Sequence, residues 1–450
     1  MTTPAPEASP RRSLVHHHDF RQLWIADTIS QLGTQITLIA LPILAVVLLD
    51  ATPFEMGILT ALEYLAFLVI GLPAGAWVDR WRRKRVLVVN DLVRAVALGS
   101  VPLAYAFDML SLYQLFAVAL ATGISTVFFD VAYQSYLPSL VHSSQIVEGN
   151  SKLAISMEVS RVAGPSAAGV LIRLLGAPLM FVFDALSFLV SAAFIGRIRH
   201  AELVHNRSTR RSLRVEIGEG LSFVLRHPLL RRIVVCTGAS NFFSTVTGTL
   251  LVLYMIRRLG LSEALVGVVF SAGAVGGLLG AVTTSRVVRW VGEGRAIPVA
   301  ALIFAPFAAL TPLAASLPLP LLWIILGWFG VGYGVVLYNV VQVSFRQRLC
   351  PIPLLGRMNA SVRFLVWGTM PLGGLVGGAL GTWIGVVPTL WVAAGGALLA
   401  AVPVVFSPLV TMRDLPAEYD THRDSKTETP EQTEHTQHSA HSEEALLDPR

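Results

Sequence analysis

Long apolar stretches recur from one end of the chain to the other, and they restrict its fold more than any other feature. A helix of about 20 apolar residues can cross the apolar layer of a bilayer, which is about 30 Å thick. Only 14% of the 450 residues are charged, whereas a soluble domain carries about a quarter. We therefore predict an all-α integral membrane protein with little chain left for a soluble domain.

The breaks between these stretches predict twelve transmembrane helices in two pseudo-symmetric bundles of six. The first six are expected at residues 22–48, 55–78, 86–107, 112–135, 147–172 and 178–198. The second six are expected at 230–256, 263–288, 296–315, 320–345, 356–382 and 386–410. The predicted units are a cytoplasmic N-terminal segment (1–21), an N-terminal bundle (22–198), a cytoplasmic linker (199–229), a C-terminal bundle (230–412) and a disordered, polar cytoplasmic tail (413–450).

Lys and Arg gather in every second connection between the predicted helices, with Arg257 and Arg258 after the seventh helix as the main exception. Cytoplasmic loops collect these residues, so both termini are expected in the cytoplasm of a multi-pass protein of the inner (plasma) membrane. The cations are Arg11, Arg12 and Arg21 before the first helix, Arg80, Arg82, Arg83, Lys84 and Arg85 after the second, Arg286, Arg289 and Arg295 after the eighth, and Arg346, Arg348 and Arg357 after the tenth.

The linker between the bundles combines arginines with apolar residues such as Leu213, Ile217 and Phe223. This mixture predicts a short amphipathic helix on the anionic inner leaflet of the membrane. A solvated linker without contact to the membrane is the alternative.

Motifs for enzymatic chemistry are missing from the sequence. The chain has no Walker loop, HExxH or GxSxG motif, and Cys236 and Cys350 form no CxxC pair. The histidines at 16–18 and at 435, 438 and 441 lack further metal ligands. The net charge of +6 comes from arginines between apolar segments, which is not the pattern of a nucleic-acid-binding face. We predict no enzyme activity, no cofactor, no metal and no nucleic-acid partner.

The two halves share small residues when they are aligned. A shift of roughly 205 to 209 positions indicates a duplicated six-helix unit of the kind that transporters use for alternating access. The matches place Gly71 and Gly75 on Gly276 and Gly280, and Asn150, Gly164 and Gly169 on Asn359, Gly373 and Gly378.

The sequence GLPAGAWVDRWRRKR (71–85), at the end of the second predicted helix, resembles the signature loop of the major facilitator superfamily, G-x-x-x-D-R-x-G-R-K. Arg82 stands where the family has its second glycine. The resemblance implies a cytoplasmic gate in which Gly75 permits close helix contact and Asp79 accepts from a neighbouring helix N-terminus. Cations that serve only as a topology signal are the alternative. The matching residues are Gly75, Asp79, Arg80, Arg83 and Lys84.

The fifth helix contains VAGPSAAG (162–169), which looks like the antiporter motif Gly-Pro-x-x-Gly-Gly of the same superfamily. Gly164, Pro165 and Gly169 match this motif, and Ala168 replaces one glycine. The resemblance implies a kinked helix and a tight contact between the halves that would seal one side. Ordinary packing of a glycine-rich helix is the alternative.

Longer phrases resemble the twelve-helix drug:proton antiporters that include macrolide and enterobactin exporters. These phrases are FFDVAYQSYLPSLV (128–141), EGNSKL (148–153) and FDALSFLVSA (183–192). They imply a secondary active exporter of a drug-like or siderophore-like small molecule, with protons and membrane lipid as further partners and a monomeric state. The fourth-helix arginine of many proton-coupled members is absent near Ala119, which weakens the proton-relay expectation. A lipid or lysophospholipid translocator and a non-transporting receptor or scaffold are the alternatives.

Acidic residues inside the predicted helices lie in the first half of the chain, whereas the second half has only Glu263 and Glu293, which are assigned to loops. Acids inside such helices are functional candidates because a charge in lipid is costly. Asp27, Asp91 and Asp130 are expected near the cytoplasmic ends and Asp184 near the outer end, which leaves two deep glutamates. We hypothesise that Glu63 or Glu158 carries a proton. Two i,i+3 pairs offer structural alternatives, Glu158 with Arg161 and, favoured as purely structural, Asp91 with Arg94. The candidate proton and charge sites are Glu63, Glu158, Arg161, Asp130 and Asp27.

The superfamily resemblance further implies a central cavity lined by the first, fourth, seventh and tenth helices. These helices offer amides and aromatic rings, which suit a bulky amphiphilic solute. The candidate lining residues are Gln31, Gln35, Phe128, Phe129, Gln134, Asn241, Phe242, Tyr338, Asn339 and Gln342.

Overall fold

The computed structural model describes residues 13–78, 80–142, 145–200, 213–351 and 354–413. Within these ranges ten helical passages are long and apolar enough to cross a membrane, in agreement with the predicted all-α membrane fold. They are α1 (His18–Val47), α4 (Arg83–Ala106), α5 (Leu112–Leu140), α7 (Ala177–Gly196), α9 (Pro228–Leu253), α10 (Glu263–Val291), α11 (Glu293–Leu313), α12 (Pro320–Arg348), α13 (Leu355–Trp367) continued by α14 (Thr369–Trp383), and α15 (Val386–Ala400) continued by α16 (Val402–Val405).

Two further passages occupy the positions of the second and fifth predicted helices. The second is divided into α2 (Pro53–Val69) and α3 (Gly71–Val78), neither of which is long enough alone. The fifth, α6 (Ile146–Leu175), is long enough but carries Glu158 and Arg161 near its middle. The second passage is therefore too short in each of its parts, and the fifth too polar near its middle, to count with the other ten.

The prediction of three unbroken helices is wrong. The second ends at Val69, the eleventh at Trp367 and the twelfth at Ala400, and a short helix continues each of them. A proline lies three or four positions beyond each of these ends, at Pro73, Pro371 and Pro403. Proline lacks the backbone N–H that would donate to the preceding turn, and its ring crowds that turn, which weakens each helix at its break. Proline alone does not break a helix here, since α6 continues through Pro165.

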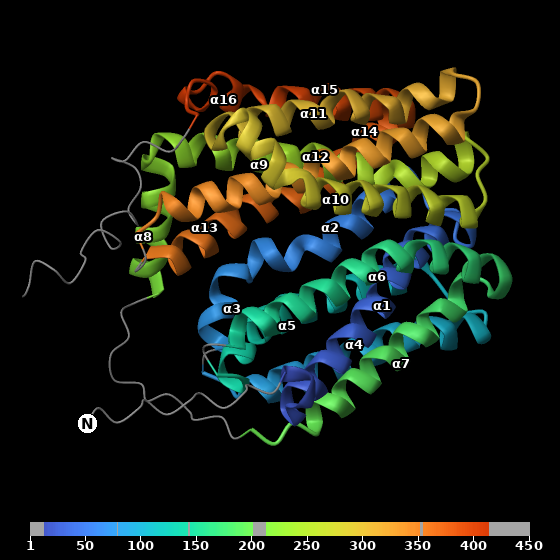
Figure 1. The fold of residues 1–450 in the computed structure, drawn as a ribbon. Helices are drawn as coiled ribbons and strands as arrows, with labels where there is room; N and C mark the ends of the chain where they lie inside the picture. Colours follow the sequence, from blue (N-terminus) through green and yellow to red (C-terminus); the bar gives the residue numbers. More distant parts are fainter. Residues whose placement is uncertain (1–12, 79, 143–144, 201–212, 352–353, 414–450) are drawn as a thin grey trace, which may run out of the picture.

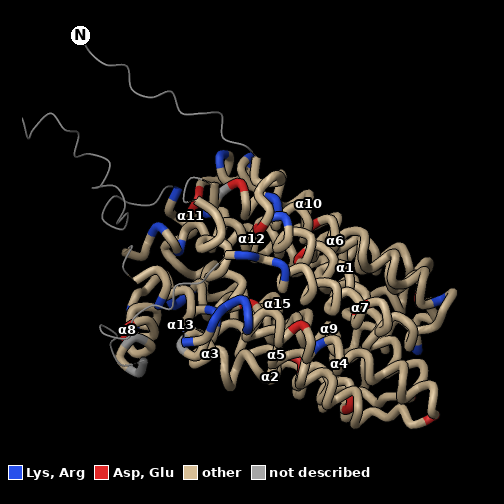
Figure 2. The backbone as a smooth tube through the Cα atoms, turned by 90° about the horizontal axis from the view of Figure 1, so that it is seen from below, with Lys and Arg blue, Asp and Glu red and all other residues tan. Residues whose placement is uncertain are grey.

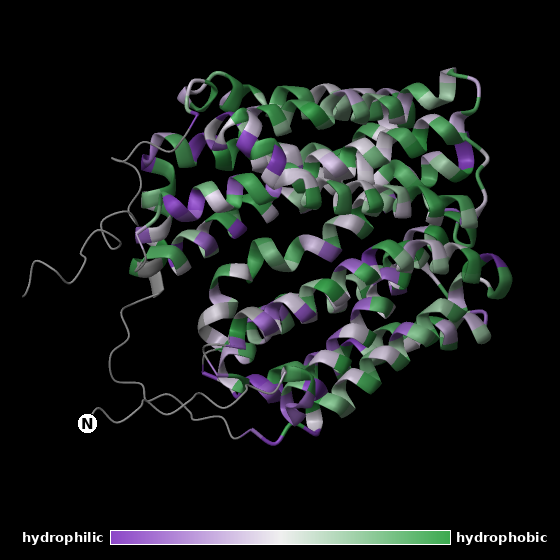
Figure 3. Ribbon diagram, in the orientation of Figure 1, coloured by the Kyte–Doolittle hydropathy of each residue, from purple (hydrophilic) through white to green (hydrophobic). Residues whose placement is uncertain are grey.

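The helices form two groups that lie side by side (Figure 1). One group contains α1 to α7 and the other contains α9 to α16. The helix α8 (Leu213–Arg226), within the predicted linker, lies at one end of the molecule beside α13. We call this end the α8 end. Most Lys and Arg residues gather there (Figure 2), whereas the helix walls are largely hydrophobic (Figure 3).

The helix α8 is packed onto the second group of helices. Glu219 forms an ion pair with Arg357 of α13, and Val224 is buried against Met358. Gly220 lies against the α13 backbone, where a Cβ atom would come within 2.7 Å of the Arg357 carbonyl oxygen. The apolar face of α8 therefore contacts protein along part of its length.

Glycines at matching positions of the two halves make matching contacts. A Cβ atom on Gly164 of α6 would lie 2.5 Å from the Cβ of Gln35 in α1. At the equivalent position of the second half, a Cβ atom on Gly373 of α14 would lie 2.6 Å from the carbonyl oxygen of Phe242 in α9. Each glycine thus lets the fifth helix of its half approach the first helix of the same half.

A second pair of matching glycines joins the two halves. A Cβ atom on Gly169 of α6 would lie 3.1 Å from the Cα of Gly267 in α10. A Cβ atom on Gly378 of α14 would lie 2.8 Å from the Cα of Gly57 in α2. Small residues allow helix backbones to approach this closely in membranes. The two contacts correspond across the repeat, since Gly378 lies 209 positions after Gly169 and Gly267 lies 210 positions after Gly57.

Candidate functional site

The two groups of helices enclose a cavity of about 350 Å³ between them. A second cavity of about 240 Å³ adjoins it, because Leu38, Asn241, Ser244 and Phe270 line both. We call the two together the central cavity. Its polar lining in the first cavity consists of Gln35, Glu158, Arg161, Thr237, Ser240, Asn241, Ser244, Tyr338 and Asn339, and its aromatic lining includes Phe270, Phe304 and Trp328.

The structure brings only part of the predicted cavity set to the central cavity. Gln35, Asn241, Tyr338 and Asn339 line it, whereas Gln31, Phe128, Phe129, Gln134, Phe242 and Gln342 are not among its lining residues. These six side chains lie on other faces of their helices, because neighbouring positions on one helix point in different directions.

Three of these six side chains have specific surroundings instead. Phe128 packs beside the ring of Trp77, with 6.1 Å between centroids. Gln342 is buried and donates to Asn339 at 3.2 Å. Gln134 lines a separate cavity at the α8 end.

Charged groups on the wall of the central cavity come from the first half of the chain. Arg161 lies 3.5 Å from the carboxylate of Glu158, one turn away on α6, and both side chains are about half exposed. Their geometry matches the neutralising pair that the i,i+3 spacing offered as an alternative. Glu63 of α2 lines the adjoining part of the cavity. Among the described residues it has no hydrogen-bond or ion-pair partner, so it is the carboxylate that is free to meet a ligand or a proton.

A further cavity of about 370 Å³ opens between the halves at the α8 end, and we call it the vestibule. Gly71, Gly75 and Gln134 line it from the first half, and Gly356 and Asn359 line it from the second. The close helix contact expected at Gly75 is wrong for this conformation, because a Cβ atom there would meet nothing within 4 Å. The reason is that Gly75 faces the vestibule, where the halves are apart.

The signature loop beside the vestibule is placed only in part. Asp79 lies outside the described residues. Arg80 is exposed in the turn between α3 and α4, with its N–H 3.0 Å from the Trp77 carbonyl oxygen. Lys84 donates to the carbonyl oxygens of Gly196 at 2.9 Å and Ile198 at 2.6 Å. A cation at this helix C-terminus is favourable because unpaired carbonyls concentrate there. Arg83 begins α4.

An ion pair inside the membrane region connects the two halves. Arg363 of α13 donates from Nη2 to the Asp130 carboxylate of α5 at 2.7 Å. The guanidinium also lies 5.4 Å from the ring centroid of Phe67 and 5.0 Å from that of Trp367. These two rings contact each other across the halves at 4.7 Å. We call Asp130 and Arg363 the ionic lock, and the four side chains together the ionic layer.

The ionic layer lies between the vestibule and the central cavity. Phe67 and Arg363 line the vestibule, whereas Glu63 and Tyr64, about one helical turn away on α2, line the central cavity. The expected position of Asp130 near a helix end is wrong, because α5 continues to Leu140 instead of ending near residue 135. Asp130 is therefore deeper in the bundle than predicted.

The sequence-based candidates do not include Arg363, although the sequence contains a signal for it. It is a cation inside the eleventh apolar stretch, and an ionisable residue there is a functional candidate by the same rule that selects the acids. Its partner is on a helix 233 positions away. Sequence spacing therefore pointed only to partners on the same helix.

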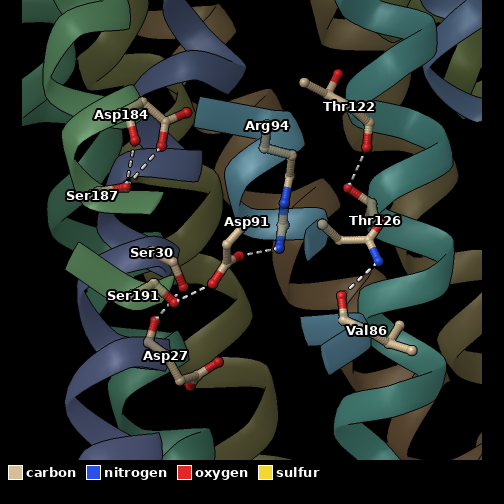
Figure 4. Close-up of polar contacts among 11 residues, drawn as sticks. Asp27, Ser30, Val86, Asp91, Arg94, Thr122, Thr126, Asp184, Ser187 and Ser191 are labelled. Atoms are coloured by element: carbon tan, nitrogen blue, oxygen red, sulfur yellow. Dashed lines mark hydrogen bonds and ion pairs between the residues drawn. The ribbon is translucent and has the colours of Figure 1, made fainter. Parts of the chain in front are cut away.

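The other aspartates of the predicted helices, Asp27, Asp91 and Asp184, make polar contacts inside the first helix group (Figure 4). Arg94 donates to Asp91 at 2.6 Å, and Ser191 of α7 donates to the other carboxylate oxygen at 2.6 Å. Arg94 is buried between the rings of Phe129 and Phe188, 4.3 and 4.2 Å from their centroids. The pair that the spacing of Asp91 and Arg94 predicts is therefore present.

Two other aspartates in Figure 4 are buried next to serines. Ser187 donates to the Asp184 carboxylate at 3.0 Å, and Ser30 donates to the backbone carbonyl of Asp27 at 3.1 Å. Asp184 fits against α1 only because residue 33 is glycine, since a Cβ atom there would lie 2.3 Å from the Asp184 carboxylate. Neither aspartate lines the described cavities, so both stay candidates without contact to a solute.

The end of the molecule opposite α8 is held closed by contacts between the halves. The Gly-Pro segment of α6 contributes Ser166, whose hydroxyl lies 2.7 Å from that of Ser271 in α10. Arg257 donates to the carbonyl oxygens of Ala51 at 2.9 Å and Val46 at 3.1 Å. With the glycine contacts of Gly169 and Gly378, these bonds seal one end, while the vestibule opens at the other.

Comparisons with known proteins agree with the helical membrane fold described above and identify one protein family. A family model described as "transmembrane secretion effector" matches residues 9–438. The multidrug efflux pump Tap of Mycolicibacterium fortuitum is 28% identical over 85% of this chain and 94% of its own. Macrolide efflux protein A of Streptococcus pyogenes is 22% identical over 88% of this chain and 97% of its own.

Solved structures are similar in fold at low sequence identity. The nucleoside transporter NupG has a TM-score of 0.71 at 12% identity, and the match covers 86% of this chain and 98% of its own. A bacterial homologue of the iron transporter ferroportin, in an inward-facing state, has a TM-score of 0.68 at 18% identity, and the match covers 86% and 97%.

Proposed function

The chain belongs to the transmembrane secretion effector family of the major facilitator superfamily, and we propose that it exports a drug-like or siderophore-like small molecule by alternating access. The observation that carries this proposal is a central cavity between two repeated helix groups whose ends differ. One end is closed by glycine contacts between the halves, and the other has a vestibule. A transporter that rocks one repeat against the other around a central site needs this arrangement.

The orientation follows from charge. Lys and Arg gather at the α8 end, and cytoplasmic loops collect these residues. The α8 end is then cytoplasmic in a plasma (inner) membrane, with residues 13 and 413 on the same side. The conformation described here is closed toward the outside, with the vestibule facing the cytoplasm. In this orientation a solute enters the cavity from the cytoplasm and leaves on the opposite side.

The cavity lining supports an amphiphilic solute. Trp328 and Phe270 offer flat apolar surface, and Asn241 and Asn339 offer amide hydrogen bonds. Pockets of this composition bind small organic molecules, with few polar groups setting their orientation. The relatives named as multidrug and macrolide efflux proteins support a drug-like solute.

Proton antiport is the proposed source of energy. The chain has no nucleotide-binding motif, and the Gly-Pro segment of α6 resembles the motif of antiporters. Glu63 is the proposed proton carrier in the cavity, because Glu158 has a cation one turn away and Glu63 has no such partner among the described residues. A carboxylate without a counter-charge is costly at this depth, so it favours a proton or a cationic solute as its partner.

Reconstituted protein tests this function. Proteoliposomes with an imposed pH gradient would be supplied with macrolides, siderophores and lipids, and uphill movement of one of these would be measured. Gradient-driven flux of a macrolide or siderophore supports the proposal. Flux of lipid alone, or of no solute, contradicts it.

A further inference from the structure

We propose that the ion pair between Asp130 and Arg363 is a proton-controlled contact between the halves, which closes the cytoplasmic side of the cavity when Asp130 is ionised and releases it when Asp130 is protonated. This inference rests on the proposed antiport function and assigns a second proton site to it, separate from the substrate-facing Glu63. The bound species is a single proton on the Asp130 carboxylate.

The position of the ionic lock gives it control over access. Asp130 belongs to α5 of the first helix group and Arg363 to α13 of the second, so the 2.7 Å contact must break when these helices separate. The other described ion pair between the groups joins Arg257 to Asp50 at the opposite end. The Asp50 side chain there is 95% exposed, and such a surface pair contributes little. The ionic lock is only about one-third exposed on each side, where ion pairing is stronger.

Aromatic rings from both halves complete the barrier. Phe67 comes from α2 and Trp367 from α13, and Arg363 is held against both rings. The layer lies between the vestibule and the central cavity. Separation of the ionic lock therefore joins the two cavities, and its formation divides them.

Other charged groups near Asp130 make its separation from Arg363 dependent on protonation of Asp130. Arg94 of α4 attracts the carboxylate and Asp27 of α1 repels it, and α3 contributes no charged residue between Gly71 and Val78. Arg94 already donates to Asp91. If Arg363 left an ionised Asp130, that carboxylate would remain in the bundle without a cation of its own, which is strongly unfavourable. A protonated Asp130 has no such requirement.

Arg363 tolerates the loss of its ion-pair partner better than an ionised Asp130 does. Arg363 lines the water-accessible vestibule and keeps its contacts with two aromatic rings, and cation–π contacts stabilise a guanidinium without a carboxylate. Because of this difference between the two side chains, Asp130 is protonated before the ion pair separates. A proton arriving from the outside neutralises Asp130, the cytoplasmic side opens, and the proton is lost to the more alkaline cytoplasm. Re-formation of the ion pair then closes that side behind the bound solute.

Distance measurements across the α8 end test this inference without a substrate. Spin labels at Arg82→Cys and Gly356→Cys would report the separation of the halves, because both positions are exposed and a Cβ atom on Gly356 meets nothing within 4 Å. In the otherwise native protein, we expect the short-distance population at alkaline pH and a shift to longer distances at acidic pH. Asp130→Asn and Arg363→Gln are each expected to show the long distances at both pH values.

Two further variants complete the experiment. The exchange Asp130→Arg with Arg363→Asp restores the pair in reverse and is expected to restore the pH-dependent shift. Asp50→Asn removes the carboxylate of the exposed ion pair at the opposite end, and it is expected to keep the shift. An Asp130→Asn protein that still moves with pH overturns the inference, as does an Asp50→Asn protein that no longer moves. Failure of every solute to be transported would refute the proposed function but would leave this distance result unchanged.

Discussion

Asp130 and Arg363 are 233 positions apart in the chain, yet the guanidinium of one lies 2.7 Å from the carboxylate of the other. This pair crosses the boundary between the repeats at a level where both side chains are mostly enclosed. Its loss should therefore be visible in stability as well as in transport.

We expect Arg363→Met to destabilise the protein and Asp130→Asn to rescue part of the loss. The single change leaves a carboxylate without its cation, and breaking a buried pair costs about 3 to 5 kcal/mol. Because both side chains are about one-third exposed, we expect about 1 to 2 kcal/mol here. Thermal unfolding in one detergent would measure it. A double variant that is less stable than Arg363→Met would contradict the account.

The contact between Gly169 and Gly267 predicts a steric test of the closed outer end. Gly169→Leu should prevent this closure, because even a Cβ atom would lie 2.7 Å from the Glu263 carbonyl oxygen. We expect a spin label on Asp50→Cys to lie further from a second label on the other helix group than in the native protein. We expect transport to fall by at least about tenfold, which corresponds to roughly 1.4 kcal/mol.

The chain offers a matched control for this glycine. Gly395→Leu places the same side chain in α15, where a Cβ atom would meet nothing within 4 Å. It should leave both transport and the outer distances as in the native protein. Equal effects of the two substitutions would indicate general damage to the helices instead of a blocked contact.

Asp91→Asn should impair folding and leave coupling intact in the protein that does fold. The change removes the carboxylate that binds Arg94 and Ser191 in a fully buried setting, and the cost of an unpaired buried cation is about 3 to 5 kcal/mol. Glu158→Gln should cost much less, about 0 to 1 kcal/mol, because its pair with Arg161 is half exposed. Expression level and thermal unfolding would compare the two. A less stable Glu158→Gln would reverse this assignment.

Asn241→Ala should weaken solute binding without affecting the response to pH. Asn241 lines both parts of the central cavity, and one neutral hydrogen bond contributes about 0.5 to 1.5 kcal/mol. We expect the Kd of a transported solute to rise by about two- to tenfold. Binding to purified protein would be measured by fluorescence or calorimetry. An unchanged Kd would remove Asn241 from the proposed site.

Apolar stretches in the sequence predict most of the helical architecture. Helix positions follow from hydropathy, whereas the interruptions before Pro73 and Pro371 were not predicted, because other prolines such as Pro165 lie inside an unbroken helix. The repeat also predicts which glycines correspond, such as Gly169 with Gly378. That Gly169 contacts Gly267, and Gly378 contacts Gly57, required the relative placement of the two helix groups.

The candidate site was less predictable because it depends on contacts between distant helices. The spacing of Asp91 with Arg94 and of Glu158 with Arg161 predicted pairs on one helix, and both pairs are present. Spacing carries no information on Asp130 with Arg363, whose contact arises only when α5 meets α13. The same limit explains Phe128 and Gln342, which lie on the expected helices but are turned away from the central cavity.

Proton-driven export is the central claim, and uphill transport in proteoliposomes measures it most directly. With the native protein, an imposed pH gradient should drive a macrolide or siderophore against its concentration gradient. Glu63→Gln and Asp130→Asn should each lose this uphill transport, because the cavity proton site or the proton-controlled contact is gone. Native protein that moves no solute in response to the gradient, or variants that keep the full response, would contradict the account.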